Sequence, residues 1–246
     1  MKKQLIISSL CLVLLLVMML STTLAWFTDS KSSVNTMVAG KISIEQTETD
    51  ENGQPFVGSN FVMMPYQTIV KKVTVENTGN QPAYVRTLFA FEDSADGMVL
   101  EMLETTGQNI EIPGVTETSV PKVQFTVTKT VDGKPVKTLY TVGYYIQPAA
   151  LSHEDDKDDV VVLESITLDA DADNEWHETV GKDYELFVLS QATQTAGLDK
   201  LGDNGAESPA AALNQAFASI TSKDCAMWFA EVLGGTADEN AITINP

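Results

Sequence analysis

The stretch "KVQFTVTKTVDGKPVKTLYTVGYYI" (Lys122–Ile146) decides the fold class of the chain. The apolar residues of its first half stand at alternate positions: Val123, Phe125, Val127 and Val131. Alternation with a period of two is typical of a β-strand that has one face in the core and one in water. The pair Asp132-Gly133 favours a tight turn, and the chain then returns as a second strand. The stretch therefore predicts a β-hairpin.

Three more regions continue this pattern on either side of the hairpin. In "IVKKVTVENTGNQPAYVRTLFAF", residues 69–91, two alternating runs flank the turn residues Asn77-Thr78-Gly79-Asn80, which predicts a second strand pair. Further strands are expected at 160–169 and 184–194. The residues expected to share faces in the second pair are Val73 and Val75 before the turn and Val85, Thr87, Phe89 and Phe91 after it. Short strands separated by turn residues predict an all-β sandwich.

One segment departs from the two-residue period. In "ESPAAALNQAFASI", residues 207–220, Ser208 is a suitable N-cap and Pro209 suits the first helical position. The expected apolar face consists of Leu213, Ala216, Phe217 and Ile220. A short helix is therefore predicted over 206–222. The remaining tail, 223–246, is expected to contain a second helical piece that ends at Gly234-Gly235.

The N-terminal segment has the form of a secretory signal peptide. Lys2 and Lys3 precede the apolar run Leu5–Leu20, and Thr23 and Ala25 suit positions −3 and −1 of a cleavage site. We expect a signal-peptide helix over 1–25, cleavage between Ala25 and Trp26, and one secreted β domain over 26–246. The alternative is an uncleaved anchor, because Leu5–Ala25 reaches the roughly 20 residues that a membrane-spanning helix needs.

Charge and cysteine content exclude some partners and some covalent chemistry. The net charge is −19, and losing Lys2 and Lys3 with the leader would make it −21. Such a surface repels nucleic acid and anionic lipid. Cys225 is the single cysteine beyond the leader, so no intramolecular disulfide can form after cleavage. Its apolar neighbours predict a buried, unreactive thiol.

No motif for catalysis or for a cofactor is present. The histidines, His153 and His177, stand in "SHEDDKDD" and "EWHET", and neither context matches a zinc-protease helix. A Gly-x-Ser-x-Gly elbow and a glycine-rich phosphate loop are both missing from the sequence. The sequence therefore predicts a protein that is not an enzyme.

Alternating carboxylates in "LDADADNEWHET" begin like a calcium loop. The loop template requires glycine at its sixth position and glutamate at its twelfth, where this chain has Asn174 and Val180. A helix–loop–helix site is thus excluded, although an extended strand could still bind calcium loosely through one face. A solvated acidic loop is the preferred interpretation, as it is for the loop 153–159. The candidate calcium ligands are Asp169, Asp171, Asp173 and Glu175.

Four stretches of the chain, taken in order, resemble the TasA/camelysin family of biofilm-matrix fibre subunits from Gram-positive bacteria. The first is "LAWFTDSKSSVNTMVAGKISI", residues 24–44, and the second is "MPYQTIVKKVTVENTGNQPAYVRT", residues 64–87. The third runs from "GYYIQPAALS" to "VVVLESITLD", and the fourth is "LSQATQTAG" followed by the alanine-rich helix. The acidic loop 153–159 and the tail beyond Ser222 have no counterpart in the family.

The resemblance implies a jelly-roll-like β-sandwich that is exported with a signal peptidase of the SipW type. It also implies assembly into extracellular fibres of itself or of related matrix subunits, at the cell surface or in the matrix. In the family, the N-terminal segment inserts into the sheet of the next subunit, a form of strand addition. The matching donor segment is 26–44, and its candidate anchors are Phe27, Val34, Met37, Ile42 and Ile44. Alternatively, Ile42 and Ile44 begin the first strand of their own domain and 26–40 is the loose part.

Two other functions stay open. The first is a secreted or surface-attached binding module for a glycan or calcium, with Tyr144, Tyr145 and Trp176 available to stack on sugars. Tyr144 and Tyr145 could equally belong to one strand and point to opposite faces. The second is metalloprotease activity, which has been described for some family members and which the missing zinc motif argues against here.

Overall fold

The computed structural model describes residues 41–57, 65–93, 103–116, 118–153, 159–169, 184–195 and 208–244. The chain divides into two compact units, Met1–Ala39 and Gly40–Pro246, and every described residue lies in the second. Its strands are β1 (Ile44–Thr49), β2 (Thr68–Asn77), β3 (Ala83–Asp93), β4 (Leu103–Gly107), β5 (Gln124–Val131), β6 (Lys134–Ile146), β7 (Asp159–Leu168), β8 (Leu186–Gln194), β9 (Thr236–Asp238) and β10 (Ala241–Thr243). Its helices are α4 (Pro209–Phe217) and α5 (Ser222–Leu233).

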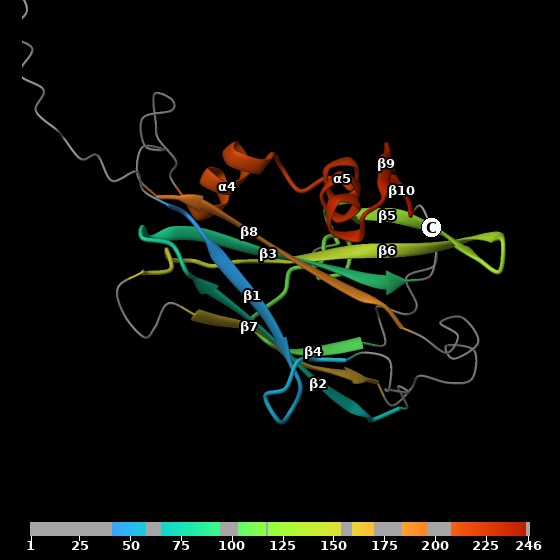
Figure 1. The fold of residues 1–246 in the computed structure, drawn as a ribbon, viewed down its shortest axis with the longest axis horizontal. Coiled ribbons are helices and arrows are strands. Elements are labelled where there is room, and N and C mark those ends of the chain that lie inside the picture. The colour runs from blue at the N-terminus through green and yellow to red at the C-terminus, as the bar shows by residue number, and fades with distance from the viewer. Residues whose placement is uncertain are drawn as a thin grey trace, which may run out of the picture. The chain divides into compact units, whose positions relative to one another are not determined.

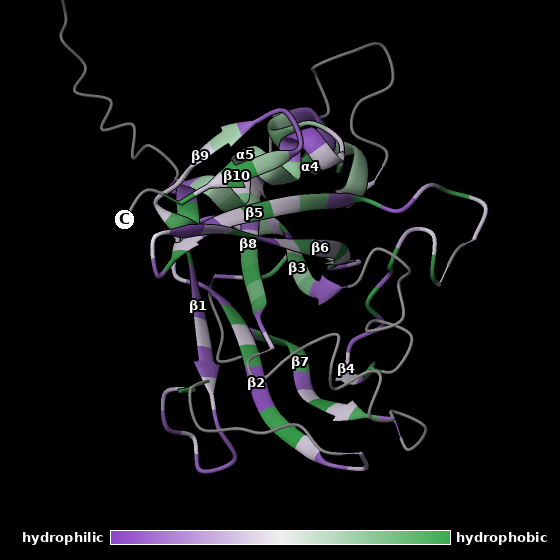
Figure 2. Cartoon of the chain, turned by 90° about the vertical axis from the view of Figure 1, so that its right-hand side faces the viewer, coloured by the Kyte–Doolittle hydropathy of each residue, from purple (hydrophilic) through white to green (hydrophobic). Residues whose placement is uncertain are grey.

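The strands form two sheets, which confirms the prediction of a mainly β fold with two short helices. One sheet has four strands in the order β1-β2-β7-β4, and the other has six in the order β8-β3-β6-β5-β10-β9. Figure 1 shows the two sheets as separate layers within this unit. Turned by 90°, Figure 2 shows α4 and α5 on the face of the six-stranded sheet that points away from the four-stranded one.

The six-stranded sheet is apolar on both faces, because it is the middle of three layers. Along β3, Val85, Phe89 and Phe91 point between the two sheets, while Leu88 and Ala90 point toward the helices. The core between the sheets also contains residues of β2, β7 and β8: Val73, Val75, Val162, Leu163, Ile166 and Val188. The core under the helices contains Phe125, Val127, Tyr140, Val142, Cys225, Ala226, Phe229 and Ile242. A strand buried on both faces loses the simple alternation, and β3 is buried almost throughout.

The hairpin predicted at residues 122–146 is confirmed. β5 and β6 pair antiparallel, with Val131 opposite Lys134. Asp132 and Gly133 both have positive φ, 50° and 74°. Two successive positive φ values define the type I′ turn, whose twist matches that of the flanking strands.

The strand pair predicted at residues 69–91 is wrong. β2 and β3 belong to different sheets, and β2 pairs with β1 and β7 while β3 pairs with β6 and β8. The connecting turn crosses between the layers and is held by Asn77, whose side-chain amide donates to the carbonyls of Gln81, Leu151 and Ser152 at 2.9, 3.1 and 2.9 Å. Both strands still face the same core, so the alternation predicted their faces correctly and their partners incorrectly.

The helices differ in detail from the predicted segment 206–222. Ser208 caps α4 as expected and accepts a hydrogen bond from the Ala211 N–H at 3.2 Å, but the helix ends at Phe217, before Ala218 with φ 71°. Leu213 is buried, whereas Ala216 is exposed and Ile220 lies beyond the helix. α5 then starts at Ser222, is capped by Thr221, and ends at Gly234 in the left-handed conformation, as the glycine pair predicted.

The segment expected to be a tail, 223–246, is part of the fold. Besides α5 it contains β9 and β10, and β10 runs parallel to β5 with Ile242 opposite Val127. Ile242 is fully buried under α5. The six-stranded sheet is therefore completed by a strand that a short, weakly alternating sequence did not reveal.

Candidate functional site

The residues predicted as calcium ligands or histidine candidates do not assemble in the described part of the chain. Asp169 follows the end of β7, and His153 is half-buried after β6. Asp171, Asp173, Glu175, His177 and Trp176 lie outside the described residues, as does most of the acidic loop 153–159. Among the described residues, no group of three or more His, Cys, Asp and Glu side chains is placed to hold a metal ion.

Tyr144 and Tyr145 point to opposite faces of β6, as one alternative predicted. Tyr144 packs against the core under the helices, and Tyr145 packs against the core between the sheets. Both side chains are half-buried. Each tyrosine therefore contributes to a core, and the two cannot stack on the same ligand.

A pocket of about 760 Å³ lies beside Tyr144. It is bounded by the β4–β5 connection, by the end of β6, and by the facing parts of α4 and α5. Besides Tyr144, the polar residues that line it are Asn109, Glu111, Thr116, Lys122, Asn214, Thr221 and Ser222. Several of these groups are already engaged, since the Asn214 Oδ1 accepts from Arg86 and the Ser222 Oγ accepts from the Gln124 N–H at 3.1 Å.

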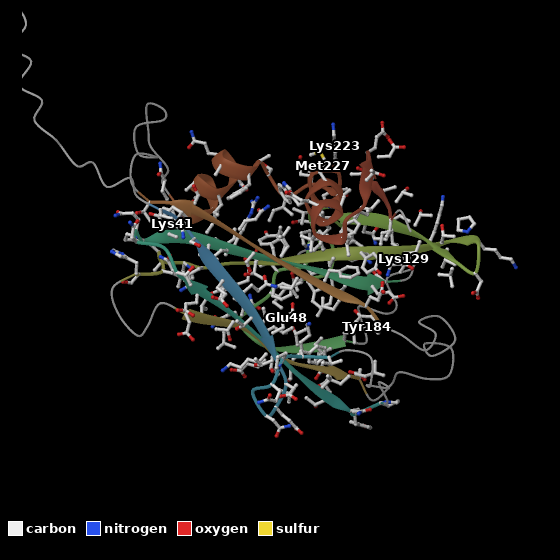
Figure 3. The ribbon with its side chains drawn as sticks, viewed as in Figure 1. Lys41, Glu48, Lys129, Tyr184, Lys223 and Met227 are labelled. Atoms are coloured by element: carbon white, nitrogen blue, oxygen red, sulfur yellow. The ribbon has the colours of Figure 1, made fainter. Side chains whose placement is uncertain are left out.

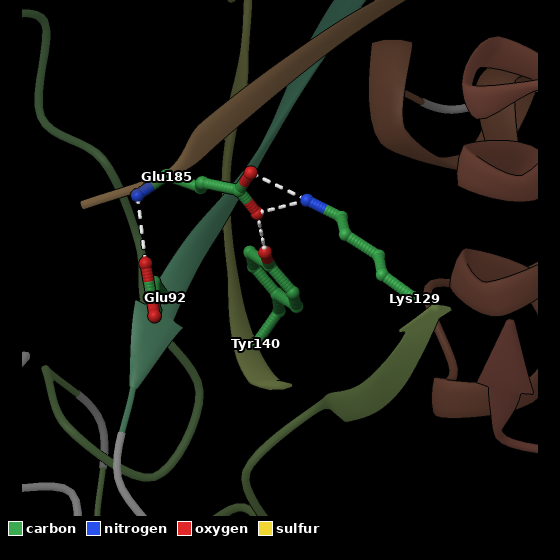
Figure 4. A network of polar contacts seen from close by, with 4 residues as sticks. All are labelled: Glu92, Lys129, Tyr140 and Glu185. Carbon is green, nitrogen blue, oxygen red and sulfur yellow. Dashed lines mark hydrogen bonds and ion pairs between the residues drawn. The ribbon is translucent and has the colours of Figure 1, made fainter. Parts of the chain in front are cut away.

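A network of polar and charged groups joins β3, β5 and β6 to Glu185, the residue just before β8. Lys129 forms an ion pair with Glu185, and the Tyr140 hydroxyl donates to the same carboxylate. The Glu185 N–H in turn donates to the Glu92 carboxylate at 2.8 Å. Figure 4 shows this closed set of contacts, in which each group has a partner. Burial first, then the hydrogen bond to Glu185 and the nearby negative charges, raises the pKa of Tyr140 far above 10.

A second polar cluster lies under the helices around Arg86, which is fully buried. Its Nε donates to the Gln191 Oε1 at 2.7 Å, its Nη1 to the Asn214 Oδ1 at 3.0 Å, and both Nη atoms to the Ala218 carbonyl at 3.3 Å. Its guanidinium also lies over the rings of Phe217 and Trp228. Burial lowers the pKa of Arg86 to about 10, so the group stays charged at neutral pH. Its hydrogen bonds join β3, β8 and α4, which is a structural arrangement.

Cys225 is confirmed as a buried thiol. It lies in the core under α5, and burial raises its pKa to about 12, although the Arg86 charge acts in the opposite direction. A thiol with so high a pKa carries almost no thiolate at neutral pH, and the thiolate is the reactive form. Cysteine-based chemistry is therefore disfavoured at this position.

We expect Cys225 to react with iodoacetamide at pH 8 on the order of 100-fold more slowly in the folded protein than in denaturant, because the thiolate is scarce and inaccessible. Mass spectrometry of Cys11→Ser protein over time measures this rate. The matched control, Lys223→Cys with Cys225→Ala and Cys11→Ser, places an exposed thiol on the same helix and should be labelled rapidly. Equal rates at the two positions would contradict the burial of Cys225.

The candidate assembly residues fall on both sides of the described boundary. Ile44 begins β1, which pairs with β2 of the same chain, and Ile42 packs against the core between the sheets. In this single chain the two residues are therefore part of their own domain. The predicted cleavage site, Ala25 and Trp26, and the other anchors, Phe27, Val34 and Met37, lie outside the described residues.

The longest unpaired strand edge among the described residues is that of β8. β8 pairs with β3 along nine residues and ends the six-stranded sheet. The Glu92 N–H donates to the Glu185 carbonyl, while the Val85 carbonyl accepts from Gln147 on the other side of β3. Because an antiparallel ladder alternates, the residues with outward main-chain groups are Leu186, Val188, Ser190, Ala192 and Gln194.

This β8 edge lies next to β1 of the other sheet. Gln46 contacts it through its side chain, donating to the Val188 carbonyl at 3.3 Å and accepting from the Ser190 hydroxyl at 2.7 Å. Two apolar side chains along the edge, Leu186 and Ala192, are incompletely buried against the core. Figure 3 shows Glu48, which pairs with Lys71, on the neighbouring β1. The β8 edge thus combines outward main-chain groups with apolar surface.

Comparison with known proteins adds no identity to this geometry, since no family model, no curated protein and no solved structure matches the chain. In the described part of the chain, neither helix has the length and apolar character needed to cross a bilayer.

The β8 edge could not be predicted from the sequence. A strand with a free edge and a strand paired on both sides can have the same alternation of apolar and polar residues. The Arg86 cluster was likewise missed, and an arginine between apolar strand residues was its only signal.

Proposed function

We propose that the protein is a secreted structural protein that self-assembles into extracellular fibres, as the resemblance to the TasA/camelysin family implies. The observation that supports this best is the β8 edge. Five of its residues have main-chain groups that point outward and could pair with an added extended segment. An added strand completes such an edge by main-chain hydrogen bonds and buries alternate side chains. In the proposal, a SipW-type signal peptidase releases the chain at Trp26, and residues 26–40 of the next subunit supply the strand.

The sandwich is proposed to be a variant of the jelly roll. Its support is the nesting of the pairs β2–β7 in one sheet and β3–β6 in the other. Consecutive strands such as β2 and β3 lie in opposite sheets, and each sheet is open, so its outermost strands, such as β8, have one side without a strand partner among the described residues. Donor exchange is a way to protect an edge of this kind.

The test uses the chain that begins at Trp26. We expect filaments by negative-stain electron microscopy from this chain and monomers after deletion of residues 26–40. Ala192→Pro should lower filament yield at least tenfold, because it removes an outward N–H from the β8 edge while leaving the bonds to β3 in place. Ala192→Ser keeps the N–H and is the matched control.

Monomers from the intact Trp26 chain, or equal filament yields from Ala192→Pro and Ala192→Ser, would count against the proposal. Melting curves of both variants establish that each is folded. N-terminal sequencing of the exported protein tests the start at Trp26 separately.

A second candidate is a glycan-binding module, and the pocket beside Tyr144 is the observation that favours it. Its lining offers one aromatic ring together with amide, hydroxyl and charged groups, a combination that can bind a sugar. Calorimetric titration with a panel of oligosaccharides, compared between the natural protein and Asn109→Ala, tests this function. Binding of any sugar that the substitution abolishes would support it.

A further inference from the structure

The hairpin tip, defined as Thr130–Lys137 at the end of β5 and β6, is a two-stranded ribbon that extends past the rest of the six-stranded sheet. β10 accompanies β5 only as far as Thr128, and β3 accompanies β6 only from Leu139 onward. All eight residues of the tip are exposed. Figure 1 shows the tip projecting beyond every other described element.

The surface of the hairpin tip carries two lysines, one aspartate (Asp132) and two exposed valines. Val131 and Val136 are 50% and 45% exposed, which places them among the few exposed large apolar residues. Lys134 and Lys137 are also exposed, and neither has an ion-pair partner in the described part of the chain. Val131, Lys134 and Val136 share the face that points toward the helices in the body of the sheet, because β5 and β6 pair in register. In the body of the sheet this same face is covered by α5, but α5 does not cover the tip.

A complementary surface is present on the four-stranded sheet. Glu45 lies opposite Glu76, and Glu76 lies opposite Asp159, so three carboxylates form an acidic row across β1, β2 and β7. All three are exposed, and none is ion-paired among the described residues. Directly opposite like charges destabilise a sheet. The neighbouring row consists of Thr47, Thr74 and Val161, which gives an uncharged strip beside the acidic row.

The hairpin tip cannot reach the acidic row of its own chain. In Figure 3, Lys41, just before β1, lies at the left of the view, and Lys129, at the base of the hairpin tip, lies to the right of centre. The face of the tip that carries the two valines points toward the helical layer, whereas the acidic row lies on the outer face of the four-stranded sheet, on the other side of the molecule in Figure 2. A contact between the two surfaces therefore joins two copies. Because the surfaces differ and point in opposite directions, such a contact is heterologous and repeats from copy to copy.

We propose that the hairpin tip of one copy docks on the acidic row of the next through the face that carries Val131, Lys134 and Val136, with Lys134 facing the carboxylates and the two valines covering the uncharged strip. This contact rests on the proposed self-assembly and adds to it a second interface, separate from the β8 edge. Most other orientations of two copies are disfavoured, because a chain with 34 acidic and 15 basic residues repels copies of itself.

The test is association of the Trp26 chain measured by sedimentation velocity at low salt and at about 1 M salt, where charges are screened beyond about 3 Å. We expect Lys134→Glu to weaken association at least tenfold at low salt, and high salt to weaken the unmodified chain similarly. Lys223→Glu, which reverses an exposed lysine on α5, is the control with the same change of charge and should leave association unchanged. Adding Glu76→Lys to Lys134→Glu should restore association.

Two results would overturn this docking. One is equal association of the Lys134→Glu variant and the unmodified chain, including the case in which neither associates. The other is a lowered melting temperature of the monomer without a change in association, which would place the hairpin's partner in its own chain. Loss of filaments on deletion of residues 26–40 with no effect of charge reversal would leave the proposed function supported and this inference refuted.

Discussion

Replacing Phe229 with alanine should lower the free energy of unfolding by about 3–5 kcal/mol, the range for a large aromatic side chain in a core. Phe229 is fully buried on the inner face of α5. Its ring stacks on Phe125 with 5.2 Å between centroids, and Phe125 stacks on Tyr140 at 5.6 Å. Truncation would leave a cavity between the helix and the sheet, and the neighbouring rings cannot close it without leaving their own contacts.

The matched control is Met227→Ala on the same helix. Met227 is 45% exposed and points away from the sheet, so its replacement should change stability by less than about 0.5 kcal/mol. Urea unfolding followed by circular dichroism measures both variants. A loss below about 1 kcal/mol for Phe229→Ala would show that α5 does not pack as the structure has it.

Arg86→Ala should cost about 3 kcal/mol of stability, because it empties a fully buried site and leaves three hydrogen-bond acceptors, of which Gln191 is buried, without their donor. The acceptors are the Gln191 Oε1, the Asn214 Oδ1 and the Ala218 carbonyl. Removing the guanidinium also exposes a gap between the rings of Phe217 and Trp228. The link from β3 to the end of α4 would be lost with it, so α4 should fray first.

Arg86→Lys separates the effect of charge from that of geometry. A lysine keeps the charge but cannot reach three acceptors from one nitrogen, so we expect a loss between those of Arg86→Ala and the unmodified protein. Lys72→Ala, an exposed cation on β2, is the control and should change stability little. Tryptophan fluorescence during urea unfolding reports the helical layer through Trp228 when Trp26 and Trp176 are replaced by phenylalanine in every variant. If Arg86→Ala were as stable as Lys72→Ala, the buried cluster would be unimportant for the fold.

Local sequence signals predicted several turns and helix ends of this fold correctly, although they missed β4, β9 and β10. Asp132-Gly133 specified the hairpin turn, Ser208 specified the start of α4, and Gly234 specified the end of α5. Each signal acts through conformational preferences or hydrogen bonds within a few residues, so the amino-acid types suffice. The side-chain faces of β2 and β3 were also predicted correctly, because alternation reports which side of a strand is apolar.

The choice of strand partners was decided by the tertiary structure. Main-chain hydrogen bonds are the same for every strand, so alternation in residues 69–91 could not distinguish a hairpin from a crossing between sheets. The buried amide of Asn77 favours the crossing, but its acceptors at Leu151 and Ser152 are more than 70 residues away. The same limit hid the sheet position of β10 and the unpaired edge of β8.

By itself, then, the sequence determined the mainly β class, the strand faces, the hairpin turn and the helix caps, all of which depend on neighbouring residues. Only the tertiary structure decided that Arg86 is buried, that β8 ends a sheet, and that the hairpin tip and the acidic row belong to different sheets. These features arise from residues far apart in the chain. Their energies depend on which surfaces meet, and no local pattern carries that information.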